Sequence, residues 1–459
     1  MKKISAEKRE LILSGNMLNV IRILAVPIVI NSFIQTMYNL TDTYWISNLG
    51  NDEMASITVV TPVQNIILNF GSGITTAGSV LISHYLGAKK DREANIMARH
   101  IFLCSMIFAF VCALLCFLAT PAVVNWLGAK GNVAAFGITY LRIVILDMPL
   151  LYTINMYQSV HQSEGDTVSP MLLNLLGMGI NLILDPVLII LFSMGVKGAA
   201  VATFAAKIPG AAIALYSLTK GGGLITIHYR DFSWDKEKFK KIIKIGLPTA
   251  IGGSTMQLGF LLMSRNVLEY GSVATAAYGI GNKVNSLITL PCNGIGSAVS
   301  IIVGQNLGAG QKDRAEKGFR ISMWISVVFL FICGRILSIP EVARPIVRIF
   351  SKDEETIYHA VNFLCLMAAW CFTNGVYNPA IALFRGAGHT MVTMTVDASR
   401  LWVFRFLTLF ICEEVLGMGV ESVWWSVVLS NATTAVIIYV LYRMGMWEKD
   451  AVRVKGDRR

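Results

Sequence analysis

Long apolar runs recur along the whole 459-residue chain, and they constrain its fold more than any other feature. Each run has the length that an α-helix needs to cross about 30 Å of hydrocarbon. Short stretches with Gly, Asn or charged residues separate the runs. We predict twelve membrane-spanning helices, at residues 18–46, 55–83, 100–120, 136–158, 169–193, 198–218, 242–268, 276–304, 321–343, 357–384, 391–412 and 423–443.

The composition agrees with an all-α integral membrane protein. Hydrophobic residues make up 54% of the chain and charged residues only 15%, whereas soluble domains carry about a quarter charged residues. The mean hydropathy is +0.60. An ordinary soluble enzyme is therefore excluded, and we expect no enzymatic activity, no cofactor and the lipid bilayer as the main surrounding. The eight cysteines lie in or beside apolar spans without CxxC pairs, so we expect them to pack rather than to bind metal.

The distribution of basic residues predicts the orientation. A net charge of +11 would suggest nucleic acid for a soluble protein, but here position matters more than the sum. If the N-terminus is cytoplasmic, the inner segments hold 25 basic residues and the outer segments hold 5. The positive-inside rule then predicts a multi-pass protein of the cell (inner or plasma) membrane with both termini cytoplasmic and no nucleic-acid partner. The first apolar run is too long for a signal-peptide core and stays as the first helix.

The chain repeats itself once. Seven residues recur 221 positions later in one register: Gly73, Ile74, Ala77, Ser79, Leu86, Gly87 and Ala88 match Gly294, Ile295, Ala298, Ser300, Leu307, Gly308 and Ala309. Each repeat holds six spans, and an even number returns the chain to its starting side, so the repeats are parallel. We predict two parallel-repeat six-helix bundles around a central cleft: an N-lobe at 1–218, a cytoplasmic basic linker at 219–241 and a C-lobe at 242–459. Because one chain supplies both halves of the cleft, we expect a monomer.

This architecture is typical of transporters that work by alternating access, although a channel or an inert scaffold would show the same duplication. The glycine-rich segment 71–79 lacks the lysine of a phosphate-binding loop, so ATP hydrolysis is not expected. Ion coupling or passive flow remains. Ion coupling needs ionisable groups within the membrane.

Polar residues of four N-lobe spans fall at similar depths. Asp42 lies about 6 Å below the outer end of its helix and Asp185 about 12 Å below, with Asn181 one turn deeper on the same face. Tyr140 and Thr203 lie within about 8 Å of the outer edge. A carboxyl that can be neutral or charged there would carry a proton. The alternatives are an interfacial Asp42 and a self-satisfied Asn181–Asp185 pair.

Further candidates are less specific. We expect Asp147 to pair with Arg142, and Asp397 with Arg400, as structural ion pairs. The second half lacks the acidic set, since Asp42 corresponds to Met263 and Asp185 to about Thr408. Lys283 has no partner that the sequence shows. Adaptable or polar side chains that could line the cleft or contact substrate are Gln35, Met37, Met256, Met263 and Lys283.

The chain resembles the multidrug and toxic compound extrusion (MATE) transporters, and within them the DinF-like branch. The resemblance rests on the duplicated layout, on AVPIVINSFIQTMYNLTDTYWISNLG at 25–50, on the LGAKKDR and LGAGQKDR loops and on NLILDP at 181–186. It implies export of cationic or amphipathic organic compounds in exchange for protons or sodium. It also implies Asp42 as the principal coupling carboxylate and a polar network that matches Tyr140, Asn181, Asp185 and Thr203.

Two positions depart from the sodium-coupled NorM-like branch. Its helix 7 glutamate corresponds here to Met256-Gln257, and its aspartate after the RG motif corresponds to His389. We therefore expect protons as the coupling ion, although oxygen ligands of Asp42, Asn181 and Asp185 could also accept Na⁺. The other alternative is a flippase for lipid-linked or polysaccharide precursors, for which Arg265, Lys283 and Arg400 would supply cationic cleft residues.

Overall fold

The computed structural model describes residues 2–47, 49–221, 223–228, 232–449 and 452. No strand occurs among these residues. The helices of the first half are α1 Lys2–Ser14, α2 Met17–Ser47, α3 Asn51–Gly87, α4 Asp91–Trp126, α5 Gly131–Leu146, α6 Met148–Ser163, α7 Val168–Pro186 and α8 Gly195–Lys220. Those of the second half are α9 Lys236–Glu269, α10 Ser272–Gly308, α11 Lys312–Leu337, α12 Pro340–Arg348, α13 Glu354–Trp370, α14 Phe372–Gly386, α15 Thr390–Ser399, α16 Phe406–Phe410 and α17 Glu421–Arg443.

The long helices confirm the predicted fold class. In the described part of the chain, nine helices are long and apolar enough to cross a membrane. Two further spans are bent pairs, α5 with α6 at 45° and α13 with α14 at 56°. The remaining predicted span, 391–412, the eleventh of the twelve, runs from α15 through α16 with π-helical stretches at Arg400–Arg405 and Ile411–Val415. Together these segments form the twelve-helix, two-repeat arrangement.

Two short helices were not predicted as separate elements. Helix α1 precedes the first span and carries polar residues on much of its surface. Helix α12 begins at Pro340, because proline is favoured in a first helical turn, and α11 ends at Leu337 rather than at 343. Helix α9 begins at Lys236, inside the predicted linker, where Asp235 accepts hydrogen bonds from the backbone N–H groups of Glu237 and Lys238.

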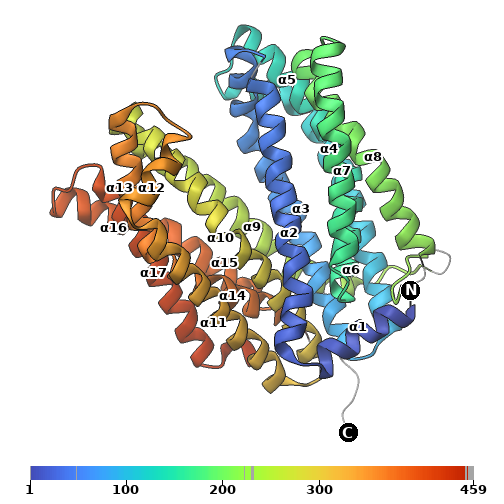
Figure 1. Cartoon of the computed structure of the whole chain (residues 1–459). Coiled ribbons are helices and arrows are strands. Elements are labelled where there is room, and N and C mark those ends of the chain that lie inside the picture. The colour runs from blue at the N-terminus through green and yellow to red at the C-terminus, as the bar shows by residue number, and fades with distance from the viewer. Residues whose placement is uncertain (1, 48, 222, 229–231, 450–451, 453–459) are drawn as a thin grey trace.

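The two halves form separate bundles that converge at one end (Figure 1). Helices α2–α8, blue to green, make one lobe, and α9–α17, yellow to red, make the other. They approach each other at the end where α1 lies and diverge at the opposite end. Between the lobes α3 packs on α9, and α10 packs on both α2 and α3.

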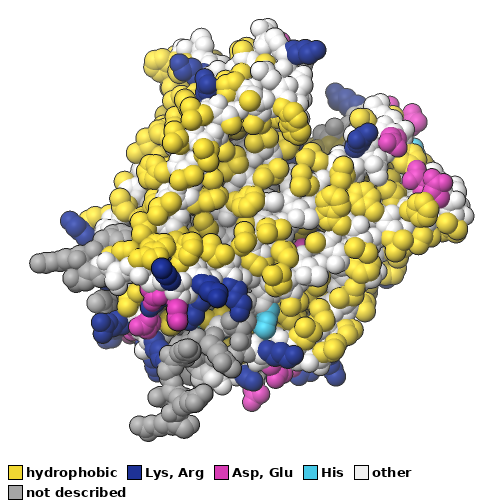
Figure 2. All heavy atoms as spheres, turned by 180° about the vertical axis from the view of Figure 1, so that it is seen from behind, with side chains coloured by type: hydrophobic (Ala, Val, Ile, Leu, Met, Phe, Trp, Pro, Cys, Tyr) yellow, Lys and Arg dark blue, Asp and Glu magenta, His cyan; other side chains and the backbone are white. Residues whose placement is uncertain are grey.

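On the face shown in Figure 2, apolar side chains cover the flanks of both lobes, whereas charged side chains gather at the two ends. Large apolar side chains are exposed along the spans, among them Phe110, Leu114, Leu118 and Ile183. Such a surface is typical of helices that contact lipid. Lipid is as apolar as a leucine side chain, so packing and interhelical hydrogen bonds hold such helices together.

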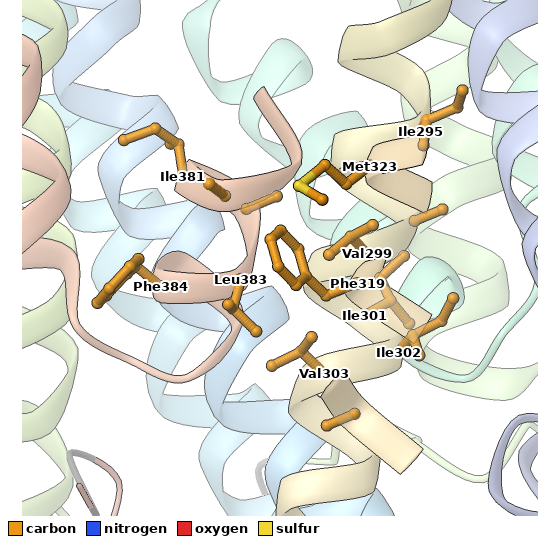
Figure 3. Close-up of a cluster of buried hydrophobic side chains, with 14 of the residues drawn as sticks. Ile295, Val299, Ile301, Ile302, Val303, Phe319, Met323, Ile381, Leu383 and Phe384 are labelled. Atoms are coloured by element: carbon orange, nitrogen blue, oxygen red, sulfur yellow. The ribbon is translucent and has the colours of Figure 1, made fainter. Parts of the chain in front are cut away.

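A large apolar cluster supports the C-lobe (Figure 3). Val299, Ile302 and Phe319 lie at its centre and are fully buried. Val20 and Leu24 of α2 belong to the same cluster, although their helix is part of the N-lobe. The converging end of the molecule is thus closed by direct packing of one lobe on the other.

Candidate functional site

The main cavity lies within the N-lobe. It has a volume of about 700 Å³ and is lined by α2, α3, α5, α6, α7 and α8. Apolar side chains such as Ile34 and Leu151 alternate with polar ones, so the wall can contact both parts of an amphipathic molecule. Four of the predicted residues line it: Gln35, Asp42, Tyr140 and Thr203.

Asp185 and Asn181 lie on α7 beside this cavity. Both side chains are buried, and Asn181 Nδ2 donates to Asp185 Oδ1 over 3.1 Å. The four-residue spacing places them on one helical face, as expected. Asp185 interacts electrostatically with Asp42 of α2. The structure therefore brings together the acidic residues that the sequence placed at similar depth.

One oxygen atom of each carboxyl group, Oδ1 of Asp42 and Oδ2 of Asp185, is buried without a hydrogen-bond partner in the described part of the chain. The buried hydroxyls of Tyr38 and Thr203 interact with each other. An unsatisfied buried polar atom costs about 1–3 kcal/mol. A proton, a water molecule or a small cation between the two carboxyl groups would remove this cost. The arrangement is therefore suited to binding and releasing such a species.

Tyr38 and Lys207 are site residues that the sequence analysis missed. Tyr38 lies one turn before Asp42 on α2, and Lys207 lies one turn after Thr203 on α8. Both line the cavity. The signal that could have found them is this four-residue spacing from a residue already selected.

Asp147 pairs with Lys207, not with Arg142 as predicted. Its Oδ2 lies 2.5 Å from Lys207 Nζ, and both residues line the cavity. Arg142 instead lies over the ring of Phe117, 5.0 Å from its centroid. The prediction considered only the neighbouring turn, whereas the break between α5 and α6 at Asp147 directs its side chain toward α8.

The predicted contacts of the C-lobe do not line this cavity. Met263 is fully buried in the C-lobe core, and Lys283 lies 5.9 Å from the ring centroid of Phe350. Met256 Sδ lies 3.5 Å from a guanidinium nitrogen of Arg400. Met37 of α2 is 48% exposed and is also absent from the lining, because it faces away from Tyr38 and Asp42.

Asp397 and Arg400 interact electrostatically, as predicted, but they make no ion-pair contact within 4.0 Å. Tyr377 donates its hydroxyl to Asp397, and the guanidinium of Arg400 lies 4.5 Å from the centroid of the same ring. The described ion pairs do not include Asp397 with Arg400. Tyr377 therefore joins the two residues.

The donor set beside the cavity could hold a hard cation. Carboxylate, amide and hydroxyl oxygens suit Na⁺ as well as a proton. No group of three or more His, Cys, Asp or Glu side chains that could hold a metal ion occurs among the described residues. A transition-metal site has no support there.

Among the hydrogen bonds that link the lobes at their converging end, two join α3 and α6 to α10 and α14. His84 Nε2 of α3 lies 2.8 Å from the carbonyl oxygen of Gly386, so that ring nitrogen must carry the hydrogen. Gln305 Nε2 of α10 donates to the carbonyl of Ser163 over 2.6 Å. His84 and Gln305 are 221 positions apart, the spacing of the internal repeat. We call these two bonds the interlobe pair.

Comparison with known families identifies the chain. The MatE family model matches residues 27–187 and 248–411, which cover most of both repeats. The chain belongs to the MatE family. This membership confirms the resemblance, and with the apolar spans it shows a multi-pass membrane transporter.

Relatives of this MatE transporter align over nearly their whole length. A probable multidrug resistance protein, YoeA of Bacillus subtilis, is 25% identical over 93% of this chain and 93% of its own length. A probable multidrug resistance protein, NorM of Thermotoga maritima, is 23% identical over 94% and 93%. The multidrug export protein MepA of Staphylococcus aureus is 23% identical over 91% and 92%.

Solved structures share the fold of this MatE transporter. A multidrug resistance MATE family transporter in an outward-facing conformation has a TM-score of 0.90 at 23% identity, over 95% of this chain and 98% of its own. A MOP superfamily transporter from Pyrococcus furiosus has a TM-score of 0.90 at 24% identity, over 96% and 98%. The binding pocket of the latter is described as having reverse polarity.

Proposed function

We propose that this MatE transporter exports cationic or amphipathic organic compounds in exchange for protons. Several of its relatives are named multidrug resistance or multidrug export proteins. The observation that carries the proposal is the Asp42 carboxyl, which lines the large cavity with one oxygen unpartnered and interacts with Asp185. The protein would act from the cell membrane as a monomer, with both termini in the cytoplasm and without an enzymatic step.

The charges of the cavity favour a cationic ligand. Its ionisable lining residues are Asp42, Asp147 and Lys207, together with the tyrosines Tyr38, Tyr140 and Tyr152. Lys207 neutralises Asp147 through the 2.5 Å ion pair, so Asp42 supplies the remaining charge when it is ionised. A single carboxylate beside an apolar wall is the chemistry that recognises an amphipathic cation.

Exchange follows if a proton and the substrate compete for Asp42. When Asp42 is charged, it attracts the cation, and the bound cation stabilises a charge that the low-dielectric surroundings disfavour. When Asp42 takes up a proton from outside, its charge disappears and the cation loses its partner. The new O–H group can donate to the unpartnered Oδ2 of Asp185, with which Asp42 interacts. The substrate then leaves as the proton enters, and alternating access carries the proton inward.

A sodium-coupled exporter is the second candidate, and the oxygen cluster of Asp42, Asn181 and Asp185 supports it chemically. A flippase for lipid-linked precursors has less support. Arg400 is held on Tyr377, and Arg405 donates to Ser430 and Asn431, so these cations are engaged inside the C-lobe. Neither lines the main cavity.

The test is dye transport in proteoliposomes. Vesicles that contain the purified protein are loaded with a fluorescent cationic dye, and its movement is followed under an imposed proton gradient and then under a sodium gradient. Proton-driven movement that Asp42→Asn abolishes supports the proposal. Sodium-driven movement would assign the coupling to Na⁺ instead.

Asp313→Asn is the matched control, because Asp313 is an exposed carboxyl at the start of α11, far along the chain from the cavity. This variant should transport as the unaltered protein does. If no gradient moves the dye, the drug-exporter proposal fails for this compound. The same vesicles would then be assayed for movement of a lipid-linked oligosaccharide analogue, as a flippase requires.

A further inference from the structure

A second cavity lies between the two lobes. Its volume is about 250 Å³, and its walls come from α3 and α6 of the N-lobe and from α10 and α14 of the C-lobe. It adjoins the main cavity, because Ser72 and Asn155 line both. Unlike the main cavity, it is shared by both repeats.

Arg385 of α14 is the one ionisable residue in the lining of this second cavity. No described carboxyl group lies within ion-pair distance of Arg385, since none of the ion pairs includes it. Its Nε atom is buried and has no hydrogen-bond partner in the described part of the chain. A guanidinium that faces a confined space without an acidic partner attracts an anion.

The other walls offer neutral hydrogen-bond donors. Thr76 and Ser79 of α3 and Ser300 of α10 present hydroxyl groups, and Gln162 of α6 presents an amide. The side chains of these four residues make no hydrogen bond to other described residues, so their O–H and N–H groups are free to donate. Hydroxyl and amide donors around an arginine fork form the usual surroundings of a bound oxyanion.

We propose that this interlobe cavity binds a phosphate group, of a free phosphate or of a lipid headgroup, on Arg385. The ligand would touch both lobes at once, since Thr76, Ser79 and Gln162 belong to the N-lobe and Arg385 and Ser300 to the C-lobe. Gly386, the next residue along, accepts the His84 hydrogen bond of the interlobe pair. Occupancy therefore stabilises the conformation in which the lobes meet at this end. The site goes beyond the proposed exchange, because it takes an anion rather than a cation.

The test is thermal unfolding of the purified full-length protein in detergent, followed by tryptophan fluorescence. Inorganic phosphate is titrated against chloride at equal ionic strength and pH. We expect a saturable rise of the unfolding temperature with phosphate beyond that with chloride. The rise should be absent in Arg385→Gln and retained in Arg320→Gln, which removes an exposed arginine of α11. A rise of equal size in Arg385→Gln, or no rise in the unaltered protein, overturns the proposal.

Ser300→Ala keeps the test decisive if Arg385→Gln does not fold. It removes one hydrogen-bond donor from the cavity. The affinity for phosphate should fall about tenfold, because a hydrogen bond to a charged group strengthens binding by at least that factor. An unchanged phosphate affinity in Ser300→Ala contradicts the proposed site. A parallel titration with short-chain phosphatidylglycerol in phosphate-free buffer distinguishes a lipid headgroup from the free ion. Stabilisation through Arg385 by either probe supports the site, and stabilisation by neither overturns it. Dye transport does not enter this measurement, so its result stands apart from that of the exchange proposal.

Discussion

A Cβ atom on Gly87 of α3 would lie 1.9 Å from the carbonyl oxygen of Gln305 on α10. The reciprocal contact exists, because a Cβ on Gly308 would lie 2.1 Å from the carbonyl oxygen of His84. The two contacts are related by the 221-residue repeat. Glycine at both positions lets α3 and α10 approach backbone to backbone at the converging end.

Gly87→Ala and Gly308→Ala should each force the lobes apart at this contact. The obstructing atoms are backbone, so relief requires movement of a helix, and overpacking of this kind costs about 1–3 kcal/mol. We expect the population to shift toward a conformation that is open at the converging end. Spin labels on the two lobes at that end would report longer distances. Gly279→Ala of α10 is the control, since a Cβ there meets nothing within 4 Å.

Loss of the interlobe pair should act in the same direction. His84→Ala and Gln305→Ala each remove one hydrogen bond between the lobes, worth about 1 kcal/mol. The same spin-label distances should lengthen in each variant and further in the double variant. Unchanged distances in the double variant would show that the remaining contacts, including the hydrogen bonds of Arg314 to α1, hold this end closed.

Lys207→Ala should destabilise the N-lobe strongly. The side chain of Asp147 is 2% exposed, and without Lys207 it becomes a buried carboxylate without a counter-charge. Such a loss typically costs about 3–5 kcal/mol. The measurement is denaturant unfolding in detergent. Asp147→Asn combined with Lys207→Gln should recover most of the stability, and failure of this rescue would contradict a purely electrostatic role for the pair.

We predict that the ion pair between Asp166 and Lys8, which holds α1 against the N-lobe, is sensitive to acid. This residue lies in the loop between α6 and α7, and burial raises its pKa. Hydrogen bonds from His161, Ser169 and Lys8 lower the pKa more, so it lies well below the usual 3.8. A depressed folded-state pKa contributes stability above pH 3.8, and this contribution is lost as the pH falls below that value.

Asp166→Asn should therefore lower the unfolding temperature at pH 7. The difference from the unaltered protein should shrink as the pH falls below about 4, where Asp166 of the unfolded chain becomes protonated. A difference that stays constant with pH would mean that the amide disturbs packing rather than removing a charge. Lys8 of α1 lies 3.0 Å from Asp166. Asp166→Asn removes this ion pair, so the rate of proteolysis within α1 should rise in this variant at pH 7.

The sequence predicted the fold well because bilayer length and the repeat register are local signals. The apolar spans and the matching of Gly87 with Gly308 needed no tertiary information. The depth of Asp42, Asp185, Tyr140 and Thr203 likewise follows from helical rise alone, and the structure places the four around one cavity or beside it. That Gly87 and Gly308 contact the opposite lobe was not visible, because the register says nothing of how the repeats pack.

The side-chain pairing could not be predicted in the same way. Asp147 lies at a helix break, and its partner Lys207 comes from a helix 60 residues later. Met263 is an apolar residue of a span, and only the packing shows that it lies in the C-lobe core rather than facing a cleft. The spacing of residues along one helix shows which of them share a helical face. Their partners on other helices depend on the rotation and tilt of each helix, which packing determines.

Proton release on substrate binding tests the central claim most directly. Purified protein in weakly buffered detergent solution receives a cationic dye, and a pH indicator follows the solution. If the cation and the proton compete for Asp42, binding should acidify the solution in proportion to the protein, and Asp42→Asn should bind without acidification. Dye binding with no proton release, or equal release from Asp42→Asn, would contradict the account.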